Sequence, residues 1–279
     1  MFHVAFLPLL TSLSSYFNSI CIDLSPTSEW KHAYEGIVCG VPLKQSEFKA
    51  HLITTGLIHL IVVSGSHLLF LGAFCEKFCK KKFVAMMILV FFTLLTNLQP
   101  PTVRALISIF LDWFCKKHFL FWTKSQHVFV SGIITLLCFP NWITSISFVM
   151  SWSASFALAS NRFHSRRVRH HLWIFLILFP IFAPLSPLNP ISILTNLTFA
   201  PMIGAILFPI SILGFISGVT KYTDFLWTAF DFAIQKVAVI APDSIRPISI
   251  PLYVLWGYLF SLHIFSHVIS VTKRQQPNA

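Results

Sequence analysis

Charged residues are scarce in this sequence of 279 residues, at 10%, whereas hydrophobic residues make up 56%. A soluble domain needs about 25% charged residues to cover itself. This chain could not cover its surface in water, which excludes a soluble enzyme and a disordered tail. The composition also excludes a collagen-like fibre and a small disulfide-rich secreted module. We therefore expect an integral membrane protein.

Several motifs of enzyme chemistry are missing as well. The six cysteines form no CxxC pair and no zinc-type Cys/His spacing, and the sequence has neither an HExxH motif nor a GxxxxGK[ST] loop. We predict no enzyme activity, no metal, no cofactor and no built-in motor. Cys21 and Cys39 lie around the one long hydrophilic stretch, and they can pair if that stretch faces an oxidising compartment.

Apolar runs separated by charge clusters or proline turns predict an all-α, polytopic membrane bundle of about 9–10 membrane-embedded helices. After an apolar segment at 2–20, which either spans or lies in the interface, the runs cover residues 51–75, 83–98, 101–115, 127–140, 142–160, 172–186, 191–219, 222–241 and 251–271. We expect three parts: an amino-terminal part with an outward-facing polar stretch (1–50), the membrane domain (51–271) and a cytoplasmic tail (272–279).

The net charge of +11 is weak evidence for a polyanionic partner, because Lys and Arg gather in cytoplasmic loops of membrane proteins. If the helix ending near Cys75 exits into the cytoplasm, alternation places most basic residues inside, Lys221 among them. Only Lys31, Lys44, Lys49 and Arg246 then fall outside. This orientation predicts a cytoplasmic carboxy terminus.

The densest polar cluster within an apolar run covers residues 54–68 and includes His59, Ser64, Gly65 and His67. Such residues cost several kcal/mol if they face lipid, so we expect them to face the bundle interior or a wet cavity. The Ser-Gly-Ser sequence at 64–66 predicts a broken helix. These residues either line a path through the protein or form a polar seam between helices.

A serine beside a histidine also suggests an intramembrane protease. That chemistry needs a base that reaches the nucleophile, usually from another helix, and an oxyanion site. His67 lies only three residues after Ser64 on the same segment. We therefore expect no proteolysis.

Arg104 follows Pro100-Pro101-Thr102-Val103 and is predicted in the first turn of a helix that begins at the outer surface. A cation there opposes the positive end of the helix dipole, so capping does not explain it. Two interpretations stay open: the side chain snorkels to the outer headgroups, or it faces a central path, where a permanently charged, bidentate guanidinium suits phosphate.

Two further segments carry candidate residues. Ser151, Ala154 and Ser155 share one helix face, which predicts a small-residue surface for close helix packing. Pro201 and Pro209 interrupt a long apolar run, so kinks are expected there. Asn196, in the same run, is a candidate to line a cavity.

Residues 55–60 (Thr-Gly-Leu-Ile-His-Leu) and 63–67 (Val-Ser-Gly-Ser-His) together resemble the signature of the membrane core, or competence domain, of ComEC-type DNA-internalisation proteins. Val103-Arg104-Ala105, residues 148–157 and residues 196–201 with Pro209 are similar to further segments of that family, in the same order. Ser66 departs from the family pattern, which has a leucine-like residue there. Nothing resembles the family's oligonucleotide-binding barrel or metallo-β-lactamase-like domain, so the resemblance implies a channel and not a nuclease.

The resemblance implies passage of single-stranded DNA through the bacterial inner membrane during natural transformation. The channel-lining candidates are then His59, Ser64, Gly65, His67, Arg104 and Asn196. The implied partners are the lipid bilayer, a cytoplasmic ATPase or helicase as motor and a periplasmic DNA receptor, and assembly into a homo-oligomer stays open.

Two alternatives remain. One is a secondary transporter of a small solute with its site at the broken helix. It would need buried carboxylates for proton coupling, and only Glu76, Asp112 and Asp231 lie in or beside the runs. The other is an assembly subunit without a transport role.

Overall fold

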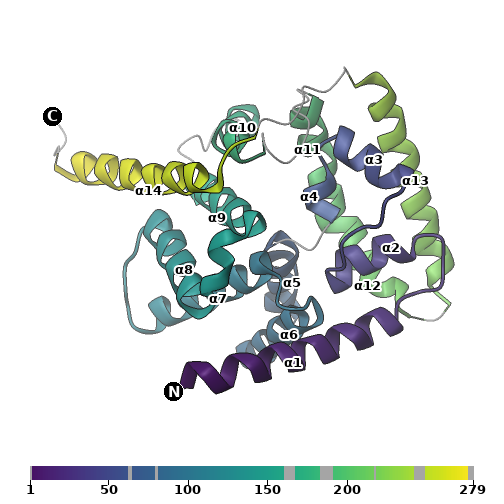
Figure 1. Ribbon diagram of the computed structural model, residues 1–279, viewed down its shortest axis with the longest axis horizontal. Helices are drawn as coiled ribbons and strands as arrows, with labels where there is room; N and C mark the ends of the chain where they lie inside the picture. The colour runs from purple at the N-terminus through teal and green to yellow at the C-terminus, as the bar shows by residue number, and fades with distance from the viewer. Residues whose placement is uncertain are drawn as a thin grey trace. The chain divides into compact units, whose positions relative to one another are not determined.

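The structure is a computed structural model that describes residues 2–61, 65–78, 81–159, 167–182, 191–216, 218–241 and 249–275. These residues are helical and contain no strand, which confirms the predicted all-α class. The chain divides into two compact units, Met1–Leu106 with Ser186–Arg246 and Ile107–Leu185 with Pro247–Ala279. Helix α7 (Pro100–Lys117) contributes residues to both (Figure 1).

The other helices follow the predicted runs closely. The first unit holds α1 (Phe2–Asp23), α2 (Lys31–Tyr34), the π-helix η1 (Glu35–Cys39), α3 (Glu47–Thr54), α4 (Ile58–Ile61), α5 (Gly65–Phe78), α6 (Lys82–Leu95), α11 (Ile191–Met202), the π-helix η3 (Ile203–Leu207), α12 (Phe208–Gly214) and α13 (Thr220–Ile240). The second holds α8 (Lys124–Cys138), the 3-10 helix η2 (Pro140–Thr144), α9 (Ile146–Ala159), α10 (Arg167–Phe182) and α14 (Leu252–Gln275).

Only one helix among the described residues is long and apolar enough to cross a membrane by itself. It runs over Leu194–Gly214 and joins α11, η3 and α12. Three shorter apolar helices cover Lys82–Leu95, Ile146–Ala159 and Leu252–Phe265. The all-helical class is therefore confirmed, whereas the predicted number of spans stays a prediction.

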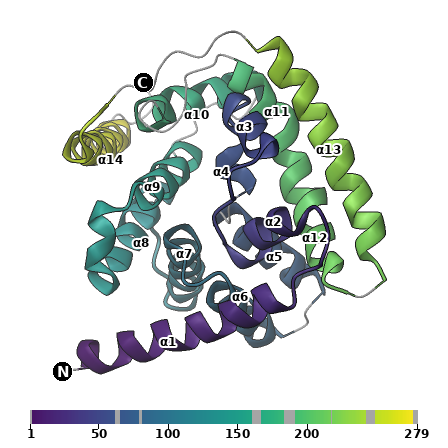
Figure 2. The same cartoon turned by 45° about the vertical axis from the view of Figure 1, so that its right-hand side comes forward.

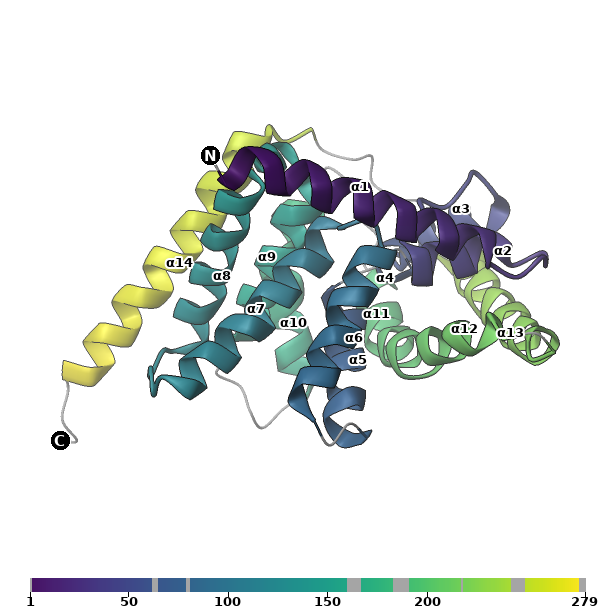
Figure 3. The ribbon, with the colours of Figure 1, turned by 90° about the horizontal axis from the view of Figure 1, so that it is seen from below.

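Helix α1 packs on the carboxy-terminal end of α6 through polar contacts. The Ser14 hydroxyl donates to the Leu94 carbonyl at 3.0 Å. The Asn18 amide donates to the carbonyls of Leu95 and Cys39, both at 2.7 Å. Figure 3 shows α1 running across the end of α6 and not alongside it. This arrangement favours the interfacial position of residues 2–20 over a first span.

A disulfide between Cys21 and Cys39 ties the end of α1 to the end of η1, with the Cα atoms 5.8 Å apart. Gly40 follows at φ +75° and lies against the end of α6, where a Cβ would come within 3.0 Å of the Thr96 carbonyl oxygen. The Gln99 amide donates to the Gly40 carbonyl at 3.2 Å. The Cys21–Cys39 pairing that the sequence left open is therefore present. Together with the contacts of Gly40, it holds the ends of α1, η1 and α6 against one another.

The polar stretch after α1 packs on the beginning of α13. The Ser28 hydroxyl and the Tyr34 phenol both donate to Asp224 Oδ1, at 3.1 and 2.8 Å. Trp30 Nε1 donates to the Thr228 hydroxyl at 3.0 Å. Burial raises the pKa of Tyr34, so the phenol stays protonated as a donor. Figure 2 shows α13 beside α3 and α12.

These contacts conflict with one pair of predicted loop positions. Alternation assigned Lys221, in the first turn of α13, to the cytoplasm, while residues 23–49 were assigned outside. The two segments pack directly on each other, so they share a side and the two assignments do not both hold. Hydropathy measures how long an apolar helix is, and it does not tell whether the helix crosses or turns back.

The second unit is an antiparallel helical bundle. Its core is built around Phe148, Trp152 and Phe156 of α9, which pack against α8, α10 and α14 (Figure 3). Gly132 of α8 lies directly against the Trp152 ring, which occupies the space of a Cβ. Trp256 Nε1 donates to the Ile143 carbonyl at 2.7 Å, which fixes the start of α14 beside η2.

Basic residues gather at one end of this bundle. Lys116 and Lys117 end α7, Lys124 begins α8, and the first turn of α10 and the last turn of α14 add the sequences Arg167-Val168-Arg169 and Lys273-Arg274. The opposite end, formed by residues 139–146 and 250–256, has no charged residue. Within this unit the separation agrees with the bias that places Lys and Arg on the cytoplasmic side.

We expect the C21S/C39S double variant to be less stable by about 3 kcal/mol, because a cross-link between residues 18 apart limits the unfolded chain. Thermal unfolding in detergent measures the loss. The half-buried free thiol of Cys138 supplies the control, and C138S should change the midpoint little. Thiol labelling of the unreduced, unfolded chain that modifies Cys21 and Cys39 would contradict the pairing.

Candidate site at the broken helix

The predicted run 51–75 is interrupted at Gly56. This residue has φ +72°, and a Cβ there would lie 2.6 Å from the Ser192 Cβ. A side chain would therefore meet both backbone strain and a clash. The chain ends α3 at Thr54 and resumes as α4 at Ile58.

Two side chains of α11 hold this turn. The Thr195 hydroxyl donates to the Thr55 carbonyl at 2.7 Å. The Asn196 amide donates to the Gly56 carbonyl at 3.4 Å and to the Ser192 carbonyl at 2.7 Å. Backbone carbonyls freed by a turn need such partners when water is excluded. Asn196 is half-buried here, and it tethers two segments.

His59 belongs to the same turn, since its ring is hydrogen-bonded to the backbone of Gly56. Its side chain is half-buried. His59 and Asn196, two of the predicted channel-lining residues, therefore both bond the backbone of Gly56, although 137 positions separate them in the sequence. They meet at the Gly56 turn, where the sequence analysis predicted no break.

The next described stretch of this run begins with α5, at Gly65. A Cβ on Gly65 would lie 3.1 Å from the Pro101 carbonyl, 3.3 Å from the Ala105 Cβ and 3.7 Å from Arg104 Nη2. The absent side chain lets the start of α5 approach the first turn of α7, including its guanidinium. Ser64, the neighbouring candidate, lies outside the described residues.

Arg104 is only 4% exposed. A snorkelling side chain would place its charged end in water, so the headgroup interpretation is wrong. The guanidinium is instead buried beside the backbone at the start of α5. Because guanidinium stays charged at any physiological pH, the first unit encloses a permanent positive charge at the broken helix.

His67 is 1% exposed and lies flat on the Phe208 ring of α12, with the ring centroids 4.6 Å apart. Phe92 of α6 meets the other edge of Phe208 at 5.6 Å. Close by, Gly204 of η3 leaves room for the Phe70 ring. For His67 the seam interpretation therefore describes the geometry better than a wet lining does.

The remaining candidates divide between the units. Pro201 lies at the end of α11 and Pro209 in the first turn of α12, with the π-helix η3 between them. Proline lacks the donor that an α-helix needs, and a π-turn is one way to absorb the loss. Ser151, Ala154 and Ser155 are half-buried on α9 in the second unit, where the predicted packing role stays a prediction.

Sequence reasoning missed Gly56, Thr195 and Phe208. A glycine that follows two threonines inside an apolar run was a usable signal for the first. Thr195 and Phe208 carried no signal, because their roles depend on which distant segment they face. Among the described residues no group of three or more His, Cys, Asp or Glu side chains is placed to hold a metal ion.

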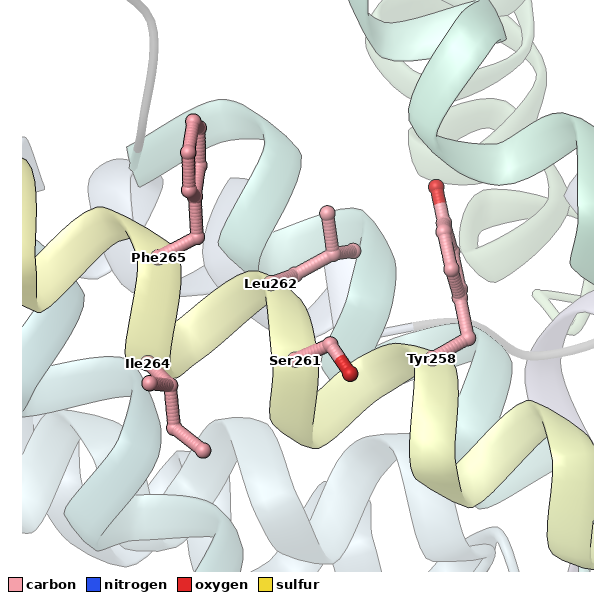
Figure 4. A pocket seen from close by; sticks show the side chains of 5 residues that line it. All are labelled: Tyr258, Ser261, Leu262, Ile264 and Phe265. Carbon is pink, nitrogen blue, oxygen red and sulfur yellow. The ribbon is translucent and has the colours of Figure 1, made fainter.

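A shallow groove lies elsewhere, along α14 in the second unit (Figure 4), and is lined by Tyr258, Ser261, Leu262, Ile264 and Phe265. Its two hydroxyls are already used: Tyr258 donates to the Ile177 carbonyl at 3.0 Å and Ser261 to the Gly257 carbonyl at 2.6 Å. The rest of the lining is apolar. The groove thus lacks the charge that distinguishes the broken helix.

Comparison with known proteins gives one family. The profile of the competence protein family matches residues 44–273. An uncharacterized protein of Aquifex aeolicus (strain VF5) is 26% identical over 188 residues, which are 64% of this chain and 45% of that relative. The chain thus spans under half the length of this relative. No solved structure matches the chain.

We expect T195V to destabilise the protein by about 1–3 kcal/mol, since the buried Thr55 carbonyl loses its partner across the break. T198V is the matched control, because the exposed Thr198 hydroxyl only bonds Leu194 within its own helix. Thermal unfolding in detergent compares the two variants. Equal midpoints would show that the tether contributes nothing.

Proposed function

The chain belongs to the competence protein family, and we propose that it is an inner-membrane channel subunit for the uptake of single-stranded DNA in natural transformation. The family suggests a role in DNA uptake. The single-stranded form of the DNA, the channel and the direction of transport go beyond the family match and are our proposal. The proposal concerns this chain only, because the match covers 45% of the relative.

One observation carries the proposal: a permanent positive charge is buried beside the start of α5, in the apolar run that turns at Gly56. The Arg104 guanidinium lies against the start of α5, with Nη2 3.7 Å from the position that a Cβ of Gly65 would take. A phosphate that passes this point would form bidentate hydrogen bonds with it.

The broken helix supplies a second requirement of a nucleic-acid path. Broken backbone at membrane depth is tolerated where it is buried in protein or lines a water-filled cavity. The Gly56 turn is such an interruption within the run 51–75 of the first unit. We propose that His59, Ser64, Gly65 and Arg104 border the path, with Asn196 holding its wall.

The orientation follows from charge and redox chemistry. We propose that the basic end of the second unit, with Lys116, Lys117 and Lys124, faces the cytoplasm. The Cys21–Cys39 disulfide supports a position of the amino-terminal polar stretch in the oxidising periplasm. The carboxy terminus, at the end of α14, is then cytoplasmic.

We further infer that α11, η3, α12 and α13 turn back to the outer side and do not cross to the cytoplasmic surface. Ser192, at the start of α11, lies against Gly56, and the Tyr34 ring lies 2.6 Å from where a Cβ of Gly214 would be. Both ends of the longest apolar helix thus contact the segment 34–56. A helix that crossed would deliver its ends to opposite surfaces.

Transport needs partners that the sequence does not contain. No phosphate-binding loop is present, so a cytoplasmic ATPase or helicase would pull the strand and a periplasmic receptor would deliver it.

A secondary transporter of a small solute is the alternative, and the described carboxylates weigh against it. Asp231 lies 3.4 Å from His51, Asp112 lies 2.6 Å from Lys116 on an exposed surface, and Glu76 is exposed. None of the three lies at the Gly56 turn or at the start of α5. Proton-coupled flux of a small solute into proteoliposomes that contain this chain alone would support the transporter instead.

We expect R104M to lower the uptake of labelled DNA by roughly tenfold or more, because a hydrogen bond to a charged group contributes about 1.5–3 kcal/mol. Methionine keeps most of the volume and removes the charge. R104K should restore part of the uptake, since it keeps the charge and loses the bidentate geometry. H59A should lower uptake as well.

The matched control is K236A, which removes an exposed cation over the Phe232 ring in the same unit. Uptake is measured as nuclease-protected label in cells with equal amounts of each variant in the membrane. Unfolding midpoints in detergent identify any variant that fails to fold. Normal uptake by folded R104M and H59A would refute the channel.

A further inference from the structure

The connection between α7 and α8, residues 118–122, exposes an unusual amount of apolar surface. Its sequence is His-Phe-Leu-Phe-Trp. Phe119 is 79% exposed and Phe121 is 93% exposed, and Leu120 and Trp122 are also exposed. Contiguous apolar surface of this kind marks a protein or membrane contact more often than a free loop.

Both ends of this connection are fixed. At the end of α7 the Leu120 amide donates to the Cys115 carbonyl at 2.9 Å, and Phe119 has φ +55°. This is the geometry of a helix end at which glycine is the usual residue. At the start of α8, Thr123 and Gln126 form a reciprocal capping box.

Phe119 therefore holds a strained backbone position that a glycine would adopt without cost. Strain that persists in a rigid turn points to a function for the side chain. The turn presents the rings of Phe119 and Phe121 outward on a short, preorganised support.

The charges around the rings select the partner. Lys116, Lys117 and Lys124 flank the connection, and Asp112 pairs with Lys116 at 2.6 Å. The Lys117 ammonium lies 5.3 Å from the centre of the Trp113 ring. Net positive charge mixed with aromatic rings is the composition that binds an anionic bilayer surface.

A nucleic-acid strand would also match cations and rings, but the surroundings favour lipid. Phe110, Trp113 and Phe114 form an exposed aromatic face on α7 that leads into the connection. Where a lipid-facing helix ends, its last aromatic rings lie at the level of the lipid headgroups, and aromatic residues of membrane proteins gather at that level. Leu120 adds apolar surface that cannot stack on a base.

We propose that residues 118–122 insert into the headgroup region of a bilayer that contains anionic phospholipid and anchor the basic end of the second unit there. The rings enter the boundary of the acyl chains, and the three lysines contact the phosphates. This anchor is independent of DNA transport, and it needs only that the chain resides in a membrane.

The test places a fluorophore beside the rings. H118C is labelled with an environment-sensitive dye in the full chain, in a background with Cys75, Cys79, Cys115 and Cys138 replaced by alanine. The chain is reconstituted into vesicles of phosphatidylcholine, with or without phosphatidylglycerol. We expect a blue shift and quenching by lipids with a headgroup-level quencher, both stronger with phosphatidylglycerol. A label at N141C, at the uncharged end of the same unit, should not respond to phosphatidylglycerol.

Two variants separate anchoring from folding. F119G should raise the unfolding midpoint in detergent, because it relieves the strained turn, yet it should weaken the quenching. K116Q/K117Q/K124Q should abolish the response to phosphatidylglycerol. A structural role for Phe119 alone would instead lower the midpoint and leave the quenching unchanged, and it would overturn the proposal.

Two further outcomes would overturn it. One is a wild-type label that stays water-exposed in vesicles with which the protein co-floats. The other is a label that responds to added single-stranded oligonucleotide and not to phosphatidylglycerol, which would assign the rings to nucleic acid. Loss of DNA uptake in cells would not affect this readout, so the two proposals fail separately.

Discussion

A backbone that turns where water is excluded must find protein partners for the carbonyls that leave the helix. The turn at Gly56 meets this requirement with Thr195 and Asn196, both from a segment about 140 positions away. Those two hydrogen bonds fix α11 against the broken run. The packing of η3 and α12 on α5 follows, with Gly204 against Phe70 and Phe208 under His67.

The same constraint explains why small residues occupy the contacts. Gly65 admits the first turn of α7, and in the second unit Gly132 admits the Trp152 ring. Each glycine lets a helix approach a neighbour more closely than any side chain would allow. In apolar surroundings close packing and hydrogen bonds hold helices together, because burial from water contributes little there.

The sequence predicts the helical class and most helix limits well, because proline turns and charge clusters interrupt apolar runs in an unambiguous way. The predicted break at residues 64–66 stays a prediction, because Ser64 lies outside the described residues. The sequence does not predict the burial of Arg104 or the tether at Gly56, since both depend on contacts between segments far apart in the chain. The conflict over Lys221 has a related reason: alternation assumes that every apolar run crosses, and α13 begins against residues 28–34.

Helices α12 and α13 return to the polar stretch, and this affects the number of times that the chain crosses the membrane. If the two apolar runs 191–219 and 222–241 turn back as proposed, both leave the count of crossings. An even number of omitted crossings leaves the direction of every later helix as it was. The proposed inward direction of α14 and the proposed cytoplasmic terminus are therefore the same with or without these two crossings.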